Sequence, residues 1–175
     1  MEVLYEDNHL IVVNKWPGEI VQGDKTGDEP LSETVKRYLK DKYAKPGNVY
    51  LGVVHRLGIT KTKKANTSKA YPKEIPGSKK AILTYKLLGA SERYFLLEIH
   101  LHTGRHHQIR CQLAAIGCPI KGDLKYGAPR SNPDGSICLH AYNLILEHPV
   151  SHQKLSITAP LPADRLWQSF RSVTK

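Results

Sequence analysis

The residues best suited to chemistry are concentrated in one short stretch, Thr103 to Arg110, which reads Thr-Gly-Arg-His-His-Gln-Ile-Arg. Guanidinium groups bind carboxylates and phosphates through paired, charge-assisted hydrogen bonds, so Arg105 and Arg110 are candidates for holding an anionic group. A single arginine is more often an ordinary solvated side chain. The density of Arg, His, Gln and Gly in this stretch nevertheless indicates a functional site.

The flanking residues predict a strand before this stretch and a helix that begins within it. Apolar and polar residues alternate from Tyr94 to Leu101, which is typical of a half-buried strand. Its expected buried face is made of Phe95, Leu97, Ile99 and Leu101. Thr103 is expected to cap the helix and Gly117 to end it. The arginines would then lie at a strand-to-helix junction, where backbone N–H groups favour an anionic partner.

A metal site is the alternative use of the histidines. His100 and His102 share one strand face, and a His-x-His pair can bind zinc. That face is expected to point to solvent, opposite Phe95, and no cysteine or carboxylate set completes a ligand shell. We therefore expect no metal. The sequence also lacks a nucleotide-binding glycine-rich loop and a Gly-x-Ser-x-Gly nucleophile motif.

The charge balance indicates a polyanionic partner. The 175 residues include 26 Lys and Arg against 16 Asp and Glu, a formal net charge of +10. Nucleic acid is the simplest partner for this excess, and an anionic membrane surface is the other candidate. The sequence has no apolar run long enough to span a membrane, and its first residues do not form a signal peptide. The three cysteines lack metal-ligand spacing and suggest reduced thiols in the cytoplasm.

The rest of the chain alternates between short strands and helices without a repeat or an obvious linker. Other strands are expected at 3–5, 10–15, 50–57, 81–88, 137–146 and 155–159. Asp28 is expected to cap a helix that has Pro30 in its first turn, and a closing helix is expected around Trp167. Residues 59–80 hold seven lysines and one acid, which predicts a mobile basic loop. The whole pattern predicts an α+β fold.

Further blocks add to the central stretch. They are Tyr5–Gly18, Val53–Leu57, Gly117–Asp123 with Tyr126-Gly127, Leu139–Ala141 and His148-Pro149. Together with residues 103–110 they resemble the RluA-type pseudouridine synthases, which isomerise uridine in ribosomal or transfer RNA. The resemblance extends over nearly the whole chain.

The resemblance implies a pseudouridine-synthase-like catalytic domain over residues 1–175, with a mixed, mainly antiparallel sheet flanked by helices. It implies a cytoplasmic monomer without metal or cofactor that acts on RNA, ribosomal RNA first and transfer RNA second. The catalytic arginine would be Arg110, with Arg105 as second choice. Arg56 would fill the space that a flipped base vacates. The other residues expected to bind RNA are His55, Lys15, His106, His107, Gln108 and Lys121.

One departure affects the expected chemistry. In the family, His-Arg-Leu is followed at once by the nucleophilic aspartate and later by a strand with an active-site tyrosine. Here Leu57 is followed by Gly58-Ile59-Thr60-Lys61, and glycine has no side chain that could attack. The chain carries a true internal deletion between Leu57 and Ile59, or else it joins two pieces of a longer enzyme. We expect these 175 residues to be inactive. A non-catalytic RNA-binding paralogue or assembly factor is the alternative function.

Overall fold

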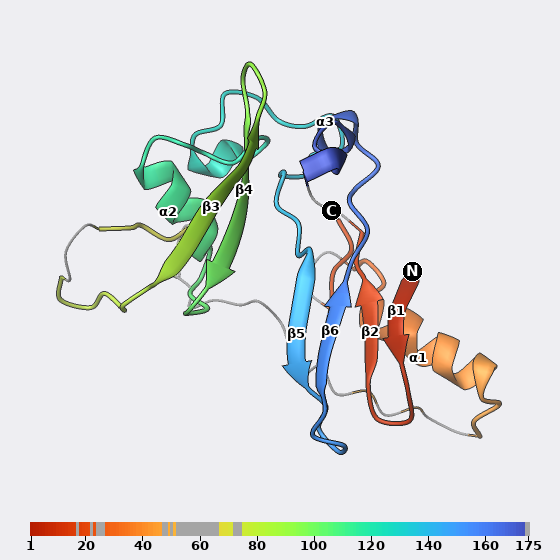
Figure 1. Cartoon of the computed structure of the whole chain (residues 1–175). Helices are drawn as coiled ribbons and strands as arrows, with labels where there is room; N and C mark the ends of the chain where they lie inside the picture. Colours follow the sequence, from red (N-terminus) through yellow and green to blue (C-terminus); the bar gives the residue numbers. More distant parts are fainter. Residues whose placement is uncertain are drawn as a thin grey trace. The chain divides into compact units, whose positions relative to one another are not determined.

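The computed structural model describes residues 1–16, 18–21, 23, 27–46, 49, 51, 67–71 and 75–173. Its strands are β1 (Glu2–Glu6), β2 (Ile11–Asn14), β3 (Leu83–Ala90), β4 (Phe95–Leu101), β5 (Asn143–Glu147) and β6 (Lys154–Thr158), shown in Figure 1. Its α-helices are α1 (Leu31–Lys42), α2 (Gln108–Ala115) and α3 (Arg165–Ser169), and its 3-10 turns are η1 (Leu124–Tyr126) and η2 (Arg171–Val173).

The α+β class predicted from the sequence is confirmed. The described strands form three antiparallel pairs, β1–β2, β3–β4 and β5–β6, each a two-stranded sheet. Most of the strand predicted at 50–57 and much of the basic loop predicted at 59–80 lie outside the described residues. Every helix of the described part is too short or too polar to cross a bilayer.

The chain divides into two compact units. Unit 1 is Met1–Arg56 with Asn143–Ala159, and unit 2 is Leu57–Tyr142 with Pro160–Lys175. The single domain expected over residues 1–175 stays a prediction.

In unit 1, helix α1 is anchored to the end of β1 by Glu6. The Glu6 carboxylate accepts hydrogen bonds from the hydroxyls of Tyr38 at 2.8 Å and Tyr43 at 2.6 Å, and it pairs with the Lys42 ammonium at 2.9 Å. These bonds, that of Tyr43 first and that of Lys42 next, lower the Glu6 pKa to about 2. Helix α1 buries Leu31 and, one helical turn later, Val35.

Helix α1 begins differently from the prediction. Pro30, not Asp28, occupies the N-cap position, and no side chain caps the helix. The first two amides of the helix donate to backbone carbonyls instead. Leu31 N donates to Ile20 O at 2.7 Å, and Ser32 N donates to Val21 O at 3.2 Å. A preceding loop therefore does what a capping side chain would do.

Asp7 closes the turn between β1 and β2. Its Oδ1 accepts hydrogen bonds from the backbone N–H groups of His9 and Leu10, each at 2.8 Å. Its Oδ2 accepts from the Tyr5 hydroxyl at 2.7 Å and from His148 Nε2 at 2.8 Å. These donors, Tyr5 first and the His9 amide next, hold the pKa of Asp7 well below its usual range.

His148 ties the β5–β6 turn to the β1–β2 turn. Its Nδ1 accepts from the backbone N–H groups of Val150 at 3.2 Å and Ser151 at 2.9 Å, so the neutral ring carries its hydrogen on Nε2 and donates it to Asp7. Asp7, His9 and His148 lie close enough to resemble a metal-ligand set. Both oxygens of Asp7 and both ring nitrogens of His148 already have protein partners, so the cluster is a structural clasp.

In unit 2, β3 and β4 form the hairpin predicted from the alternating residues. Leu83 pairs with Leu101 and Leu87 with Leu97, and a bulge between Leu87 and Gly89 then shifts the register. Gly89 lies against the buried Phe170 ring, where an added Cβ would meet a ring carbon at 3.2 Å. The bulge and the glycine together let the closing segment pack on the hairpin.

The predicted buried face of β4 is wrong at both of its ends, because Leu101 is 37% exposed and Phe95 is more exposed still. Phe95 is 66% exposed, whereas Leu96 is buried. The register shift between Leu87 and Gly89 leaves Leu88 of β3 as the extra residue, and beyond it Leu96 pairs with Gly89 and Phe95 with Ala90 at the end of the ladder. His100 and His102 are exposed, as predicted.

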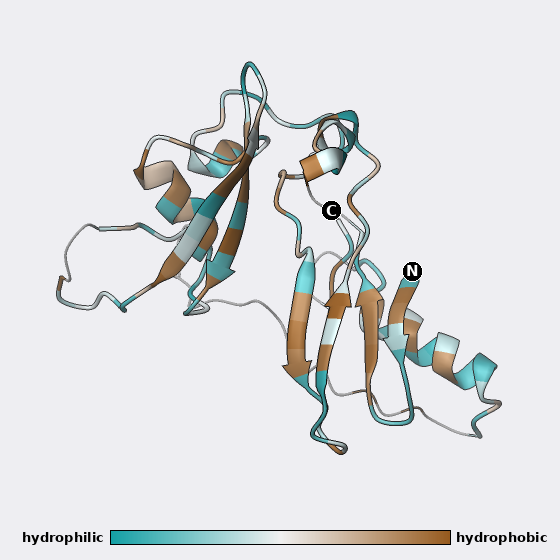
Figure 2. Ribbon diagram, in the orientation of Figure 1, coloured by the Kyte–Doolittle hydropathy of each residue, from teal (hydrophilic) through white to brown (hydrophobic). Residues whose placement is uncertain are grey.

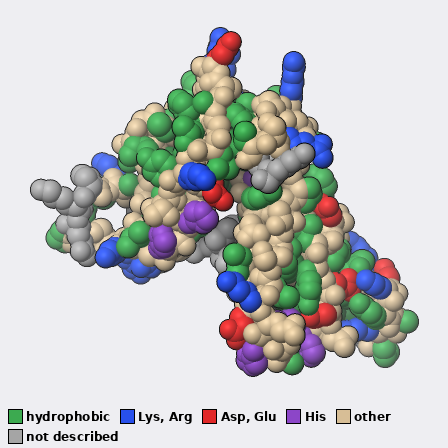
Figure 3. Space-filling view, viewed as in Figure 1, with side chains coloured by type: hydrophobic (Ala, Val, Ile, Leu, Met, Phe, Trp, Pro, Cys, Tyr) green, Lys and Arg blue, Asp and Glu red, His purple; other side chains and the backbone are tan. Residues whose placement is uncertain are grey.

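The hairpin leaves much apolar surface uncovered. Apolar residues run along β3 and β4 in Figure 2, and Figure 3 shows hydrophobic side chains gathered over this hairpin. Tyr85 and Leu87 of β3 are 55% and 54% exposed.

The lowered pKa of Asp7 predicts that part of the stability depends on pH. A carboxyl whose pKa is lower in the folded state stabilises that state above its unfolded pKa, and the contribution is lost as pH falls through the folded pKa. We expect Asp7→Asn to lose less stability than the wild-type protein when the pH is lowered from 7 to 3. Urea unfolding at both pH values measures this. The exposed Glu92→Gln serves as control, and equal losses in the wild type and Asp7→Asn would contradict the proposed clasp.

Candidate active site

Gln108 organises the loop that precedes helix α2. It is 4% exposed, and its Oε1 accepts from the Thr103 hydroxyl and from the Arg105 N–H, both at 2.9 Å. Its Nε2 donates to the Ile82 carbonyl at 3.0 Å. The predicted cap at Thr103 is therefore wrong: the helix begins at Gln108, and Thr103 fixes the loop by binding a side chain rather than a helix amide.

Arg110 forms a bidentate ion pair with Asp123. Arg110 Nε donates to Asp123 Oδ2 at 2.7 Å and Nη2 donates to Oδ1 at 2.6 Å. The aspartate side chain is 1% exposed and the arginine side chain 18%. The hydrogen bond to Asp123 raises the pKa of Arg110, so the guanidinium stays charged. Because both carboxylate oxygens of Asp123 are bound to Arg110, Asp123 is not free to act as a nucleophile in this conformation.

A tight turn holds Asp123 in place. Gly122 has φ +87°, and an added Cβ would lie 2.4 Å from the Ser136 carbonyl oxygen. Asn132 spans the same turn: its Nδ2 donates to that carbonyl at 3.0 Å, and its Oδ1 accepts from the Lys121 ammonium. Only glycine allows this close approach of the two backbone segments.

His107 and Tyr126 enclose Arg110 on its other sides. Arg110 Nη1 lies 3.0 Å from His107 Nε2, and the guanidinium carbon lies 4.9 Å from the centre of the Tyr126 ring. The Tyr126 hydroxyl lies 2.8 Å from His107 Nδ1 and accepts from Ser68 N at 2.7 Å. Burial first, and the charge of Arg110 next, lower the His107 pKa to about 4. Burial is also the main cause that raises the pKa of Tyr126.

His106 is a buried neighbour of the same cluster. It is buried, its Nδ1 lies 2.8 Å from the Ser68 hydroxyl, and its ring lies 3.8 Å from the ring of His107. His106 and Gln108 were both predicted to bind RNA. In this conformation their side chains bind protein groups, and their contact with RNA stays a prediction.

The side chains of the other predicted site residues that the structure describes bind groups outside this cluster. Arg105 is exposed and uses Nε to bind the Lys80 carbonyl at 3.0 Å. Lys121 binds Asn132, as described above. Lys15 is exposed and donates to the carbonyls of residues 16 and 19 at 2.8 and 2.9 Å. His55 and Arg56 lie outside the described residues.

Sequence reasoning did not assign the partners of Arg110. Asp123 and Tyr126 belong to the block around Gly117–Gly127, but nothing in their spacing specified which side chain they would contact. Ser68 lies in a lysine-rich stretch and carried no signal. The preceding glycine, Gly122, was the signal that could have indicated Asp123. A glycine often marks a tight turn, and the residue after such a turn can be held in a fixed position.

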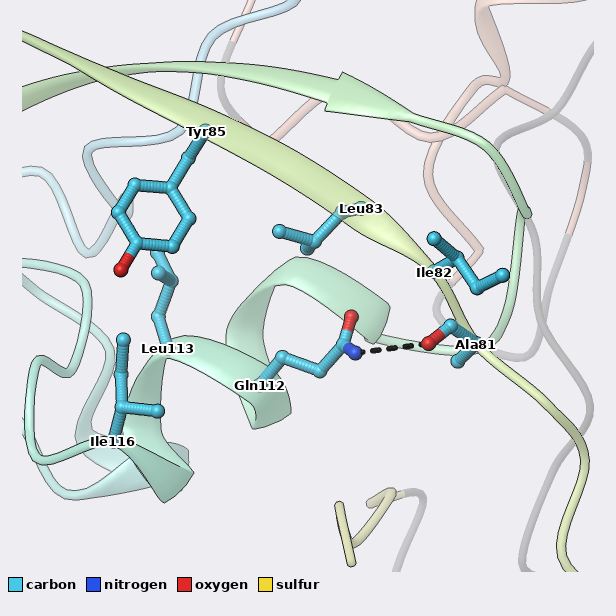
Figure 4. A pocket seen from close by; sticks show the side chains of 7 residues that line it. All are labelled: Ala81, Ile82, Leu83, Tyr85, Gln112, Leu113 and Ile116. Carbon is cyan, nitrogen blue, oxygen red and sulfur yellow. Dashed lines mark hydrogen bonds between the residues drawn. The ribbon is translucent and has the colours of Figure 1, made fainter. Parts of the chain in front are cut away.

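A groove lies between the start of β3 and α2. Figure 4 shows this groove, which has a volume of about 260 Å³. Its lining residues are Ala81, Ile82, Leu83, Tyr85, Gln112, Leu113 and Ile116. Gln112 Nε2 donates to the Ala81 carbonyl at 3.2 Å, while the buried Oε1 has no donor among the described residues. The lining has no charged side chain, and Tyr85 carries its one ionisable group.

Comparisons with known proteins agree on one kind of enzyme. The sequence pattern of the family described as RNA pseudouridylate synthase matches residues 58–115. An uncharacterized RNA pseudouridine synthase of Chloroflexus aurantiacus is 47% identical over 91 residues, which are 51% of this chain and 29% of that protein. The ribosomal large subunit pseudouridine synthase C of Rickettsia bellii is 34% identical over 134 residues, which are 73% of this chain and 42% of that protein.

A relative that aligns with nearly the whole chain shows that it has residues that this chain lacks. The RNA pseudouridine synthase YhcT of Bacillus subtilis is 27% identical over 211 residues, covering 94% of this chain and 70% of that protein. The alignment is longer than the 175-residue chain itself, so the relative has residues within the aligned range that this chain lacks. The chain spans less than half the length of the Chloroflexus and Rickettsia proteins that it matches.

The turn at Gly122 allows a matched pair of substitutions. Gly122→Ala should destabilise the protein by about 3 kcal/mol, because the new Cβ meets a backbone oxygen in addition to the strain of positive φ. Gly127→Ala, at φ +95° with open space around it, should cost only about 1 kcal/mol. Urea unfolding measures both. Equal losses would show that the packing between Gly122 and Ser136 does not hold the turn.

Proposed function

Because the chain belongs to the RluA-type RNA pseudouridine synthase family, we propose that it forms the arginine-bearing part of an enzyme that isomerises uridine to pseudouridine in RNA. The observation that carries the proposal is the setting of Arg110. Asp123 and His107 occupy three of its N–H groups. A guanidinium has five, so two remain to hold an incoming carboxylate or phosphate.

In the proposed mechanism a target uridine leaves its base stack and enters the site. The carboxylate of an aspartate attacks, the glycosidic bond breaks, and the base rotates and rejoins the sugar through carbon. Arg110 keeps that aspartate ionised and oriented. The guanidinium is already charged and fixed, so no reorganisation is needed when the anionic group arrives.

The nucleophile is the part that this chain lacks. The family motif places an aspartate directly after Leu57, where this chain has Gly58. Asp123 does not replace it, since both of its oxygens are bound to Arg110. We therefore propose that the 175 residues bind RNA without turnover, and that the segment present in longer relatives supplies the attacking group.

The RNA partner of this chain is also part of the proposal. The printed name of the Rickettsia relative refers to the large ribosomal subunit, which favours ribosomal RNA over transfer RNA. The net charge of +10 supports binding to a phosphate backbone. Arg105 and Lys15 are exposed and are the described residues that we propose for phosphate contacts; His55 and Arg56 complete the set.

The activity is tested by restoring the missing segment. A chimera that carries, after Leu57, the residues that YhcT has and this chain lacks should form pseudouridine in unmodified ribosomal RNA, detected by reaction with carbodiimide. The 175-residue chain should form none. In the chimera, the neutral pair Arg110→Gln with Asp123→Asn should lower kcat by about a hundredfold or more, because it removes the fixed charge.

The double substitution avoids leaving a buried carboxylate without its partner, which Arg110→Ala would do. Glu92→Gln with Arg93→Gln, at the exposed tip of the β3–β4 hairpin, is the matched control and should retain activity. Turnover by the 175-residue chain would show that the nucleophile lies elsewhere. A folded but inactive chimera that still binds RNA would favour the non-catalytic RNA-binding alternative.

RNA binding itself is expected to weaken steeply as salt rises, because each neutralised phosphate releases counterions. Arg105→Gln should reduce the slope of log affinity against log salt by about one. Arg165→Gln in α3 changes the charge equally and should leave the slope unchanged if α3 does not contact RNA. Titration of ribosomal RNA fragments at several salt concentrations measures both. A slope that does not differ between Arg105→Gln and the unmodified chain would remove Arg105 from the interface.

A further inference from the structure

His107 occupies an unusual backbone position between two chemically active groups. It is the N-cap residue of α2 and has φ +50°, a left-handed conformation that residues with side chains rarely adopt. Its ring nitrogens lie 3.0 Å from Arg110 Nη1 and 2.8 Å from the Tyr126 hydroxyl. A strained backbone conformation persists where the surrounding structure requires it.

The neighbours of His107 determine which nitrogen carries its hydrogen. A guanidinium can only donate, so His107 Nε2 must accept from Arg110 Nη1. In the neutral ring the hydrogen is then on Nδ1, which donates to the Tyr126 hydroxyl oxygen. That oxygen also accepts from Ser68 N at 2.7 Å, which fills its acceptor capacity. The hydrogen bonds therefore have a fixed direction. Arg110 donates to His107, and both His107 and the Ser68 N–H donate to the Tyr126 hydroxyl oxygen.

We propose that His107 is a positioning residue, whose neutral imidazole sets the rotation of the Arg110 guanidinium and so directs its two remaining N–H groups. Asp123 alone fixes one edge of the guanidinium through Nε and Nη2. His107 fixes Nη1, on a second side. The identity of the incoming anion, the carboxylate of the nucleophile, rests on the proposed function.

The role requires that His107 stay neutral. A protonated ring would place an N–H opposite the N–H of Arg110 and two positive charges side by side. The charged or titratable groups around His107 are Arg110 from α2, His106 from the preceding loop, and Lys125, Tyr126 and Asp123 from the turn around η1. Three of these, Arg110, His106 and Lys125, act against protonation, while Asp123 acts weakly in the opposite direction. Burial reinforces the neutral form.

Two substitutions at position 107 separate positioning from backbone geometry. His107→Asn suits the left-handed backbone but is too short to reach both partners. His107→Gln can accept from Arg110 through Oε1 and donate to Tyr126 through Nε2, although glutamine fits the backbone less well. A purely structural role predicts that Asn is the better substitute. A positioning role predicts that Gln is.

The test uses the 175-residue chain and nuclear magnetic resonance, so it does not require RNA. Nitrogen shifts should show the Nδ1–H tautomer of His107 at neutral pH and no protonation down to about pH 5. Hydrogen exchange of the Arg110 Nη1–H group, which donates to His107, should accelerate about tenfold in His107→Asn and remain within about threefold of the unmodified protein in His107→Gln, which is the range expected for one hydrogen bond lost or kept. Urea unfolding of both variants shows that they are folded.

Three results would overturn the proposal: the Nε2–H tautomer, titration of His107 near pH 6.5, or equal exchange of Arg110 in the Asn and Gln variants. In the chimera described above, His107→Asn should lower kcat more than His107→Gln does. An inactive unsubstituted chimera would instead contradict the proposed function and leave the resonance results on His107 intact.

Discussion

The ion pair between Arg110 and Asp123 is the interaction on which the rest of the site depends. An aspartate that is 1% exposed cannot remain charged in the interior without a close partner, and Arg110 provides one through two hydrogen bonds. The turn at Gly122 brings the carboxylate to the helix, and His107 and Tyr126 enclose the guanidinium. Without the ion pair, the Gly122 turn would present no partner to the helix, and His107 and Tyr126 would have no fixed guanidinium to contact.

The elements of the fold could be predicted from sequence more readily than the contacts of the site. Alternating residues correctly indicated β3 and β4, because strand periodicity is a local property. The exposure of Phe95 and the burial of Leu96 could not be predicted, since alternation alone does not show which face of the strand its neighbours cover. The arginine-rich stretch was recognised from its composition. That Gln108, not Thr103, organises its loop depends on the position of Ile82, far away in the sequence.

The exposed apolar side chains of β3 and the departure from the family motif after Leu57 are both compatible with one missing segment. Tyr85 and Leu87 are half exposed on a two-stranded sheet, and a relative has residues inside the aligned range that this chain lacks. The family motif breaks directly after Leu57. We propose that one missing segment accounts both for the aspartate expected after Leu57 and for the exposed apolar side chains of β3 among the described residues. The arginine part of the site does not depend on it, because its partners are all present in this chain.

The most direct test of this account is a double-mutant cycle on the ion pair, with Arg110→Gln and Asp123→Asn alone and combined, measured by urea unfolding of the 175-residue chain. Each single substitution leaves a buried charge without its partner and should cost about 3 kcal/mol or more. The combined variant should cost clearly less than the sum, with a coupling of about 2 kcal/mol or more. Additive costs would show that Arg110 and Asp123 do not depend on one another, and the account of the site would fail.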